Sequence, residues 1–113
     1  MTLAEQFLKD RGDKKIGLMT HLVCGYPDFA SNDAVLEQMN DAGVEVVEFQ
    51  FPFSEPVADG PLFAQANQIS IENGTRIDDC FKLMERAAAK YSFQPLMMGY
   101  YNPVFKMTEE LFC

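Results

Sequence analysis

Residues 48–61 place three acidic side chains where a strand would run into a loop. Glu48 lies in a strand-like run, and Glu55 and Asp59 follow in a segment rich in proline and glycine. Sheet interiors normally exclude glutamate, and parallel α/β proteins carry their chemistry at strand ends and in the loops that follow. Glu48 is therefore a candidate acid/base group, with a buried glutamate paired to a basic side chain as the alternative. Asp59 before Gly60 is, by itself, typical of a turn.

The secondary structure that holds these acids is expected in the order helix, then β-α-β-α-α-β. Hydrophobic periodicity, capping residues and turn residues delimit each element. Strands that alternate with helices predict a parallel sheet of the α/β class. The expected elements are helix 3–11 ended by Gly12, buried strand 16–23, a helix from 31–33 closed by Gly43, strand 44–51, a helix from Pro61 to 73–74, a helix capped by Thr75, and strand 96–101 followed by a turn at 102–103.

Strand 44–51 has two faces because successive side chains of a strand alternate. The alternation puts Glu48 and Gln50 on one face, with Val44 and Val46. The opposite face carries Glu45, Val47, Phe49 and Phe51.

Composition excludes some function classes. The 113 residues suffice for one small domain, and 48% of them are hydrophobic, so a buried core is expected. A net charge of −8 argues against nucleic acid or a membrane surface as partner, because phosphates would be repelled. A phosphorylated small substrate remains compatible, since backbone N–H groups can hold a phosphate locally.

The cysteines and the two chain ends carry further expectations. Cys24, Cys80 and Cys113 have no metal-binding spacing, and their odd number favours reduced thiols in the cytoplasm. Neither a signal peptide nor a membrane-spanning run is visible. Residues 108–112 begin a helical pattern at the very end of the sequence, which predicts the N-terminal portion of a longer protein.

Residues 48–61 resemble the signature of the tryptophan synthase alpha subunit family, whose usual form is E-L-G-x-P-F-S-D-P-x-A-D-G-P. The sequence here is E-F-Q-F-P-F-S-E-P-V-A-D-G-P. The resemblance extends over residues 5–112 and includes segments 24–28, 41–48, 65–67 and 97–105.

This resemblance implies a (β/α)8 TIM barrel, of which the chain would supply the N-terminal three β/α units; such barrels need roughly 250 residues. It implies a lyase of tryptophan biosynthesis that cleaves indole-3-glycerol phosphate to indole and glyceraldehyde 3-phosphate by a retro-aldol reaction. The partner would be a beta subunit containing pyridoxal phosphate, in a heterotetramer, and the alpha subunit would use no cofactor or metal. The 113 residues alone should be inactive, because the family's phosphate-binding loops follow later strands.

The resemblance also assigns roles to individual residues. Glu48 matches the acid/base carboxylate and Asp59 the second catalytic carboxylate, which accepts a hydrogen bond from the indole N–H. Tyr100 and Met98 would line the substrate pocket. His21, which stands where the family usually has an apolar aromatic residue, would lie there too, although a lone histidine in a strand is more often a satisfied core residue. The loop that would dock the partner contains Pro52, Phe53, Ser54, Glu55 and Pro56.

Two residues depart from the family pattern. Gln50 replaces a glycine on the face of Glu48, where its amide could fill substrate space or hydrogen-bond the carboxylate. Glu55 replaces an aspartate and keeps the charge. Two alternatives therefore stay open: a non-catalytic subunit that binds and activates a beta-type partner, and a related phosphate-handling barrel lyase with another substrate.

Overall fold

The chain folds into a three-stranded parallel sheet flanked by helices, as a computed structural model shows for residues 2–53 and 60–100. The sheet has the order β1-β2-β3, so the predicted α/β class with parallel strands is confirmed. The elements are α1 (Leu3–Arg11), β1 (Met19–Val23), α2 (Phe29–Asp41), β2 (Val46–Gln50), α3 (Gly60–Glu72), α4 (Ile77–Lys90) and β3 (Gln94–Met98).

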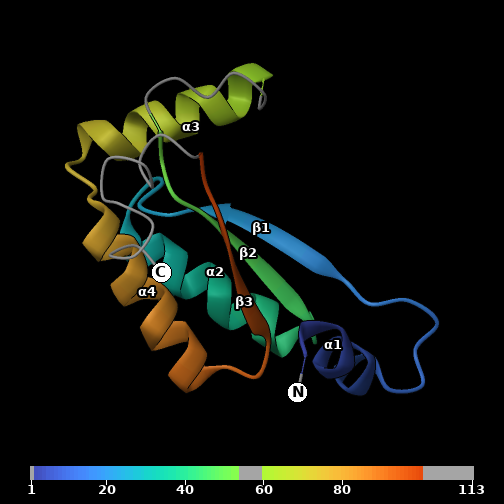
Figure 1. Ribbon diagram of the computed structural model, residues 1–113. Coiled ribbons are helices and arrows are strands. Elements are labelled where there is room, and N and C mark those ends of the chain that lie inside the picture. The colour runs from blue at the N-terminus through green and yellow to red at the C-terminus, as the bar shows by residue number, and fades with distance from the viewer. Residues whose placement is uncertain (1, 54–59, 101–113) are drawn as a thin grey trace.

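Helices occupy distinct places around the sheet. Figure 1 shows α2 and α4 on one side of the sheet, α3 beyond the carboxyl ends of the strands, and α1 near their amino ends. Hydrogen bonds from the backbone N–H and hydroxyl of Ser92, which follows α4, to Asn40 of α2 link the two helices (3.1 and 3.0 Å). Within the described residues, no helix is both long enough and apolar enough to cross a membrane.

The hydrophobic core lies between the sheet and helices α2 and α4. Strand β2 contributes Val47 and Phe49 to this core, and Phe51 follows directly after the strand. These side chains pack in one cluster with buried Leu36 of α2 and Leu83 of α4. Burying each such side chain contributes roughly 1.5–3 kcal/mol. This face is the one that the alternation of β2 assigns to apolar residues, which leaves Glu48 and Gln50 on the opposite face.

The first strand is shorter than the sequence predicts, and its beginning is not buried. Strand β1 starts at Met19, whose register partner is Val46, the first residue of β2. Ile16 and Leu18 are 80% and 54% exposed. Ile16 precedes the paired region, and Leu18 joins it only through its carbonyl, which accepts the N–H groups of Glu45 and Val46 (3.1 and 3.3 Å). Apolar character alone therefore misplaced the start of the strand.

Glu45, just before β2, is a buried acid that is only 3% exposed. Its carboxylate accepts a hydrogen bond from the Leu18 N–H (2.6 Å) and pairs with Lys14. These contacts explain how an acid is tolerated beside the core, because both its charge and its hydrogen-bonding capacity are satisfied.

Two helices begin at other residues than predicted. Asp28, not residues 31–33, caps α2, and its carboxylate accepts the Ser31 N–H (2.7 Å). The N-cap of α4 is Arg76 rather than Thr75; the Arg76 N–H donates to the carboxylate of Asp79 (3.0 Å). The predicted end of α2 is confirmed, since Gly43 adopts a positive φ of 80° just beyond it.

Strand β3 runs from Gln94 to Met98 and includes Pro95, whereas the sequence predicts residues 96–101. The Gln94 N–H donates to the carbonyl of Glu45 (2.9 Å), which starts the pairing before the proline. Pro95 has no N–H to donate, and the neighbouring Gln94 makes this bond to the chain just before β2. The predicted turn at 102–103 and helix start at 108–112 lie outside the described residues.

Candidate active site

Glu48 lies at the centre of the sheet, on the face away from α2 and α4. Its register partners are His21 on β1 and Leu96 on β3. The Glu48 side chain is 22% exposed and that of His21 is 25% exposed, and Glu48 Oε1 lies 4.0 Å from His21 Nε2. The structure therefore brings these two predicted site residues together, with a partly accessible carboxylate between an imidazole and an apolar residue.

Gln50 lies one step further along the same face and is 1% exposed. Its register partners are Val23 and Met98, so the predicted pocket residue Met98 shares this face. Met98 is half-buried. The amide of Gln50 thus occupies the layer directly above Glu48, toward the carboxyl ends of the strands.

The start of the predicted docking loop is fixed between β3 and α3. The Phe53 ring stacks on the Tyr100 ring, with centroids 4.9 Å apart and an interplanar angle of 23°. The Phe53 N–H donates to the side-chain oxygen of Asn67 on α3 (2.8 Å), and the Asn67 amide donates to the carbonyl of Phe63 (2.7 Å). Pro52 and Phe53 are half-buried. Ser54, Glu55, Pro56 and Asp59 lie outside the described residues.

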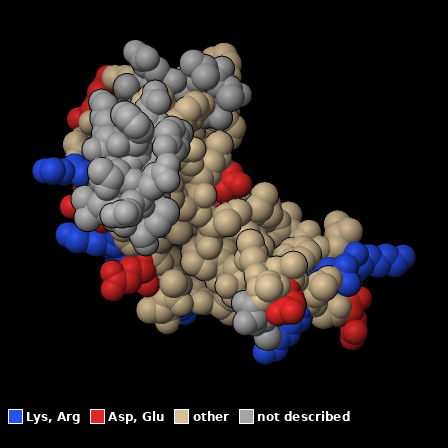
Figure 2. All heavy atoms as spheres, in the orientation of Figure 1, with Lys and Arg blue, Asp and Glu red and all other residues tan. Residues whose placement is uncertain are grey.

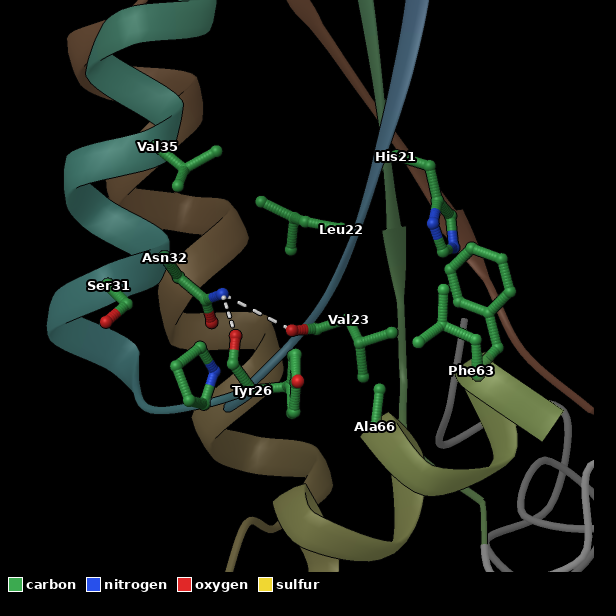
Figure 3. Close-up of a pocket in the computed structure, with 11 residues that line it drawn as sticks. His21, Leu22, Val23, Tyr26, Ser31, Asn32, Val35, Phe63 and Ala66 are labelled. Atoms are coloured by element: carbon green, nitrogen blue, oxygen red, sulfur yellow. Dashed lines mark hydrogen bonds between the residues drawn. The ribbon is translucent and has the colours of Figure 1, made fainter.

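The turn after β1 depends on polar residues that the sequence patterns do not single out. Asn32 of α2 is 3% exposed; its side-chain oxygen accepts the Gly25 N–H (2.7 Å), and its amide donates to the carbonyls of Val23 (3.3 Å) and Tyr26 (3.1 Å). Figure 3 shows the Asn32 side chain reaching into this turn. The sequence could have indicated this role, because Asn32 lies one helical turn before the core residue Leu36, on the same face of α2.

Helix α3 presents a second set of buried polar groups. Asn67 and Ser70 are both 0% exposed, next to Ala66. Two polar residues three positions apart lie on the same face of a helix. Their spacing could have predicted that this face hydrogen-bonds to the backbone of other segments instead of packing in an apolar core. Through this face α3 holds the segments that follow β1 and β2.

A cavity of about 330 Å³ lies between β1, α2 and α3. Its walls are mainly apolar and include His21, Val35 and Phe63 (Figure 3). His21 and Phe63 meet edge to face, with ring centroids 5.0 Å apart and an interplanar angle of 86°.

Among the residues coloured in Figure 2, charged side chains lie mainly toward the outline of this face, and one acidic group is visible near its middle. Among the residues that the structure describes, no three His, Cys, Asp or Glu side chains form a group that could hold a metal ion.

Comparison with known proteins gives one consistent family. A sequence model described as "Tryptophan synthase alpha chain" matches residues 7–113. A tryptophan synthase alpha chain from Desulfotalea psychrophila is 49% identical over 112 residues, which are 99% of this chain and 44% of that protein.

Comparison with solved structures gives the same family. Tryptophan synthase from Mycobacterium tuberculosis aligns with a TM-score of 0.87 at 28% identity, covering 97% of this chain and 44% of that one. A tryptophan synthase complex from Pyrococcus furiosus aligns with a TM-score of 0.79 at 27% identity, covering 85% of this chain and 39% of that one. The predicted fold, the N-terminal three β/α units of a TIM barrel, is confirmed, and the chain spans less than half the length of these relatives.

Proposed function

The chain belongs to the tryptophan synthase alpha chain family, and from this membership we propose that it carries part of the active site of a lyase of tryptophan biosynthesis. The proposed reaction is the retro-aldol cleavage of indole-3-glycerol phosphate to indole and glyceraldehyde 3-phosphate. One observation carries this proposal: the Glu48 carboxylate is partly accessible on the sheet face away from α2 and α4, and Met98, which is predicted to line the pocket, lies on that face.

In the proposed reaction Glu48 acts as both acid and base. It delivers a proton to indole C3 and takes one from the glycerol hydroxyl, while the carbon–carbon bond between the two parts of the substrate breaks. A carboxyl group that substrate can reach is able to serve both steps. Asp59 is proposed to accept a hydrogen bond from the indole N–H as charge develops, and Tyr100 to line the pocket beside Phe53.

The proposed partner is a beta-type subunit that contains pyridoxal phosphate and receives the indole. This chain would contribute no cofactor, and neither nucleic acid nor a membrane is a proposed partner. The segment that would dock the partner starts at Pro52 and Phe53, and Asn67 of α3 accepts a hydrogen bond from the Phe53 N–H. A cytoplasmic location stays a prediction.

A second candidate function is a non-catalytic subunit that binds and activates the beta-type partner. The burial of Gln50 beside Glu48 favours it, because that side chain fills space on the catalytic face. A barrel lyase that acts on another phosphorylated substrate is the remaining alternative.

Indole release from indole-3-glycerol phosphate by the natural full-length polypeptide that carries this sequence tests the proposal. We expect turnover by the parent and a loss of at least about 100-fold in kcat for Glu48→Gln, since one acid/base group contributes about 10²–10⁴-fold. A silent parent that gains activity on Gln50→Gly would establish the non-catalytic subunit. Turnover of a different phosphorylated substrate in a screen would establish the related lyase.

A further inference from the structure

An aromatic stack joins the segment after β2 to the segment after β3. The Phe53 ring lies on the Tyr100 ring, with centroids 4.9 Å apart and an interplanar angle of 23°. Phe53 follows shortly after Gln50, the last residue of β2, and Tyr100 shortly after Met98, the last residue of β3. Both aromatic side chains are half-buried. Because the carboxyl ends of parallel strands meet at one edge of a sheet, the stack lies at the edge where α/β proteins bind their substrates.

Tyr100 continues the series of β3 residues that share the face of Glu48. Leu96 is the register partner of Glu48, and Met98 follows on the same face because successive side chains of a strand alternate. The pairing of the two chains extends past β2, since the Phe51 N–H donates to the Met98 carbonyl (2.9 Å). Continuing the alternation puts Tyr100 on this face, nearer the carboxyl edge than Glu48, where it can contact a substrate that reaches the carboxylate.

Helix α3 holds Phe53 and contacts the same side of the sheet. Asn67 of α3 is 0% exposed; its side-chain oxygen accepts the Phe53 N–H (2.8 Å), and its amide donates to the carbonyl of Phe63 (2.7 Å). The Phe63 ring in turn meets His21, the register partner of Glu48, edge to face (Figure 3). The backbone that carries the Phe53 ring is therefore fixed by the helix that also contacts the Glu48 face.

The stack restrains the Tyr100 ring from one side. Two stacked rings keep a preferred separation and tilt, so Tyr100 samples fewer orientations with the Phe53 ring beside it than without it. A side chain that is already ordered loses less conformational entropy when a ligand binds. Loss of the Phe53 ring should therefore weaken substrate binding and leave the chemical step at Glu48 nearly unchanged.

We propose that Phe53 is a positioning residue, which holds the Tyr100 ring in the orientation that contacts the indole part of the substrate. The inference rests on the proposed function, because the place of Tyr100 in the substrate pocket belongs to it. The hydrogen bond to Asn67 places Phe53, and the Phe53 ring places Tyr100. Phe53 acts through Tyr100 and takes no part in proton transfer.

A double-mutant cycle on indole release by the natural full-length polypeptide tests this role. Phe53→Leu should raise KM for indole-3-glycerol phosphate about threefold to tenfold, the range expected for one aromatic pair, and leave kcat within about twofold. Phe53→Tyr keeps a stacking ring and should retain the parent KM. In the Tyr100→Leu background, Phe53→Leu should have no further effect on KM, since the ring that it positions is gone. An equal rise in KM from Phe53→Leu in both backgrounds would overturn the proposal.

Phe81→Leu is the matched control. Phe81 of α4 meets Phe51 edge to face, with ring centroids 5.0 Å apart, and packs against the core on the opposite face of the sheet. The variant removes an aromatic pair near the end of β2 and leaves the stack intact, so it should lower stability and leave KM unchanged. A rise in KM as large as that in Phe53→Leu would show a general effect of lost packing and overturn the proposal.

The two proposals fail differently. If the parent releases no indole, the lyase function fails, and isothermal titration calorimetry with indole-3-propanol phosphate, which lacks the glycerol hydroxyls, still decides the role of Phe53. A Kd about threefold to tenfold higher in Phe53→Leu than in the parent supports the proposal. The same Kd in both, or no binding by the parent, overturns it. Phe53→Met replaces Phe53→Leu in both measurements if the latter variant does not fold.

Discussion

The hydroxyl of Ser70 on α3 donates a 2.6 Å hydrogen bond to the carbonyl of Cys24 at the end of β1. Both residues are completely buried. The bond joins positions 46 residues apart and ties α3 to the turn that follows the first strand. Helix α3 therefore holds the backbone after β1 in place. The same helix holds Phe53, at the start of the proposed docking loop.

Replacing Gly25 tests how closely α3 and the turn are packed. Gly25 has a φ of 79°, and an added Cβ would lie 2.2 Å from Thr75 Oγ1 and 2.7 Å from Ser70 Oγ. Gly43 is the matched control, with a φ of 80° and no atom within 4 Å of an added Cβ. Gly43→Ala should lower the free energy of unfolding by about 1 kcal/mol through backbone strain alone. Gly25→Ala should lower it by about 2 kcal/mol more, because overpacking is added.

Urea denaturation of the natural full-length polypeptide measures both glycine variants. If both variants lose the same free energy of unfolding, the turn can move away from Thr75 at no measurable cost in stability, which would contradict the prediction.

Replacing Asn67 tests the support of the docking segment. Asn67→Ala removes the acceptor for the Phe53 N–H and the donor to the Phe63 carbonyl. We expect kcat/KM for indole release to fall at least about tenfold, since small displacements of site residues cost up to about 100-fold. Asn67→Asp keeps the acceptor for Phe53 and should recover part of the loss. An unchanged kcat/KM in Asn67→Ala would show that the activity does not depend on this hydrogen bond.

The contacts of Glu45 predict an unequal pair of stability effects. Glu45→Ala leaves the Leu18 N–H without its acceptor and Lys14 without its partner, and should lower the free energy of unfolding by about 2–3 kcal/mol. Lys14 is 54% exposed, so Lys14→Ala should lower it by about 1 kcal/mol or less. Denaturant unfolding of the two variants checks the order of the effects, and a larger loss in Lys14→Ala would contradict it.

The thiol of Cys24 should resist alkylation in the folded protein. A hydrogen bond with the Cys80 thiol and then burial raise the pKa of Cys24 well above its ordinary value, so the nucleophilic thiolate does not form near neutral pH. Iodoacetamide labelling at pH 8, followed by mass spectrometry, should modify Cys24 only after unfolding in urea. Rapid labelling of the native protein would contradict the buried arrangement.

The raised pKa of Cys24 also makes the stability of the protein depend on pH. Above about pH 8.5 the unfolded state releases the Cys24 proton while the folded state keeps it, so the free energy of unfolding should fall as the pH rises. Cys24→Ala should weaken that pH dependence, as denaturation at pH 7 and pH 10 would show.

Patterns in the amino-acid sequence predict the order of the elements, the parallel sheet and the face of β2 that carries Glu48. These features follow from local patterns: an alternation of period two separates Glu48 from Phe49, and glycine with a positive φ closes α2 at Gly43. The family signature further assigned Glu48 and Asp59 their expected roles, and the fold class that it implied agrees with the solved structures.

The contacts between distant segments could not be predicted from the sequence and are seen in the folded chain. The register of β1 against β2 sets His21 beside Glu48, the packing of α3 turns Phe63 onto that imidazole, and Thr75 lies against Gly25 instead of capping α4. Apolar character likewise could not show that Ile16 precedes the paired strand and stays exposed. The physical reason is common to all four: strand register and helix packing depend on the whole set of buried contacts, whereas periodicity and capping report only on near neighbours in the chain.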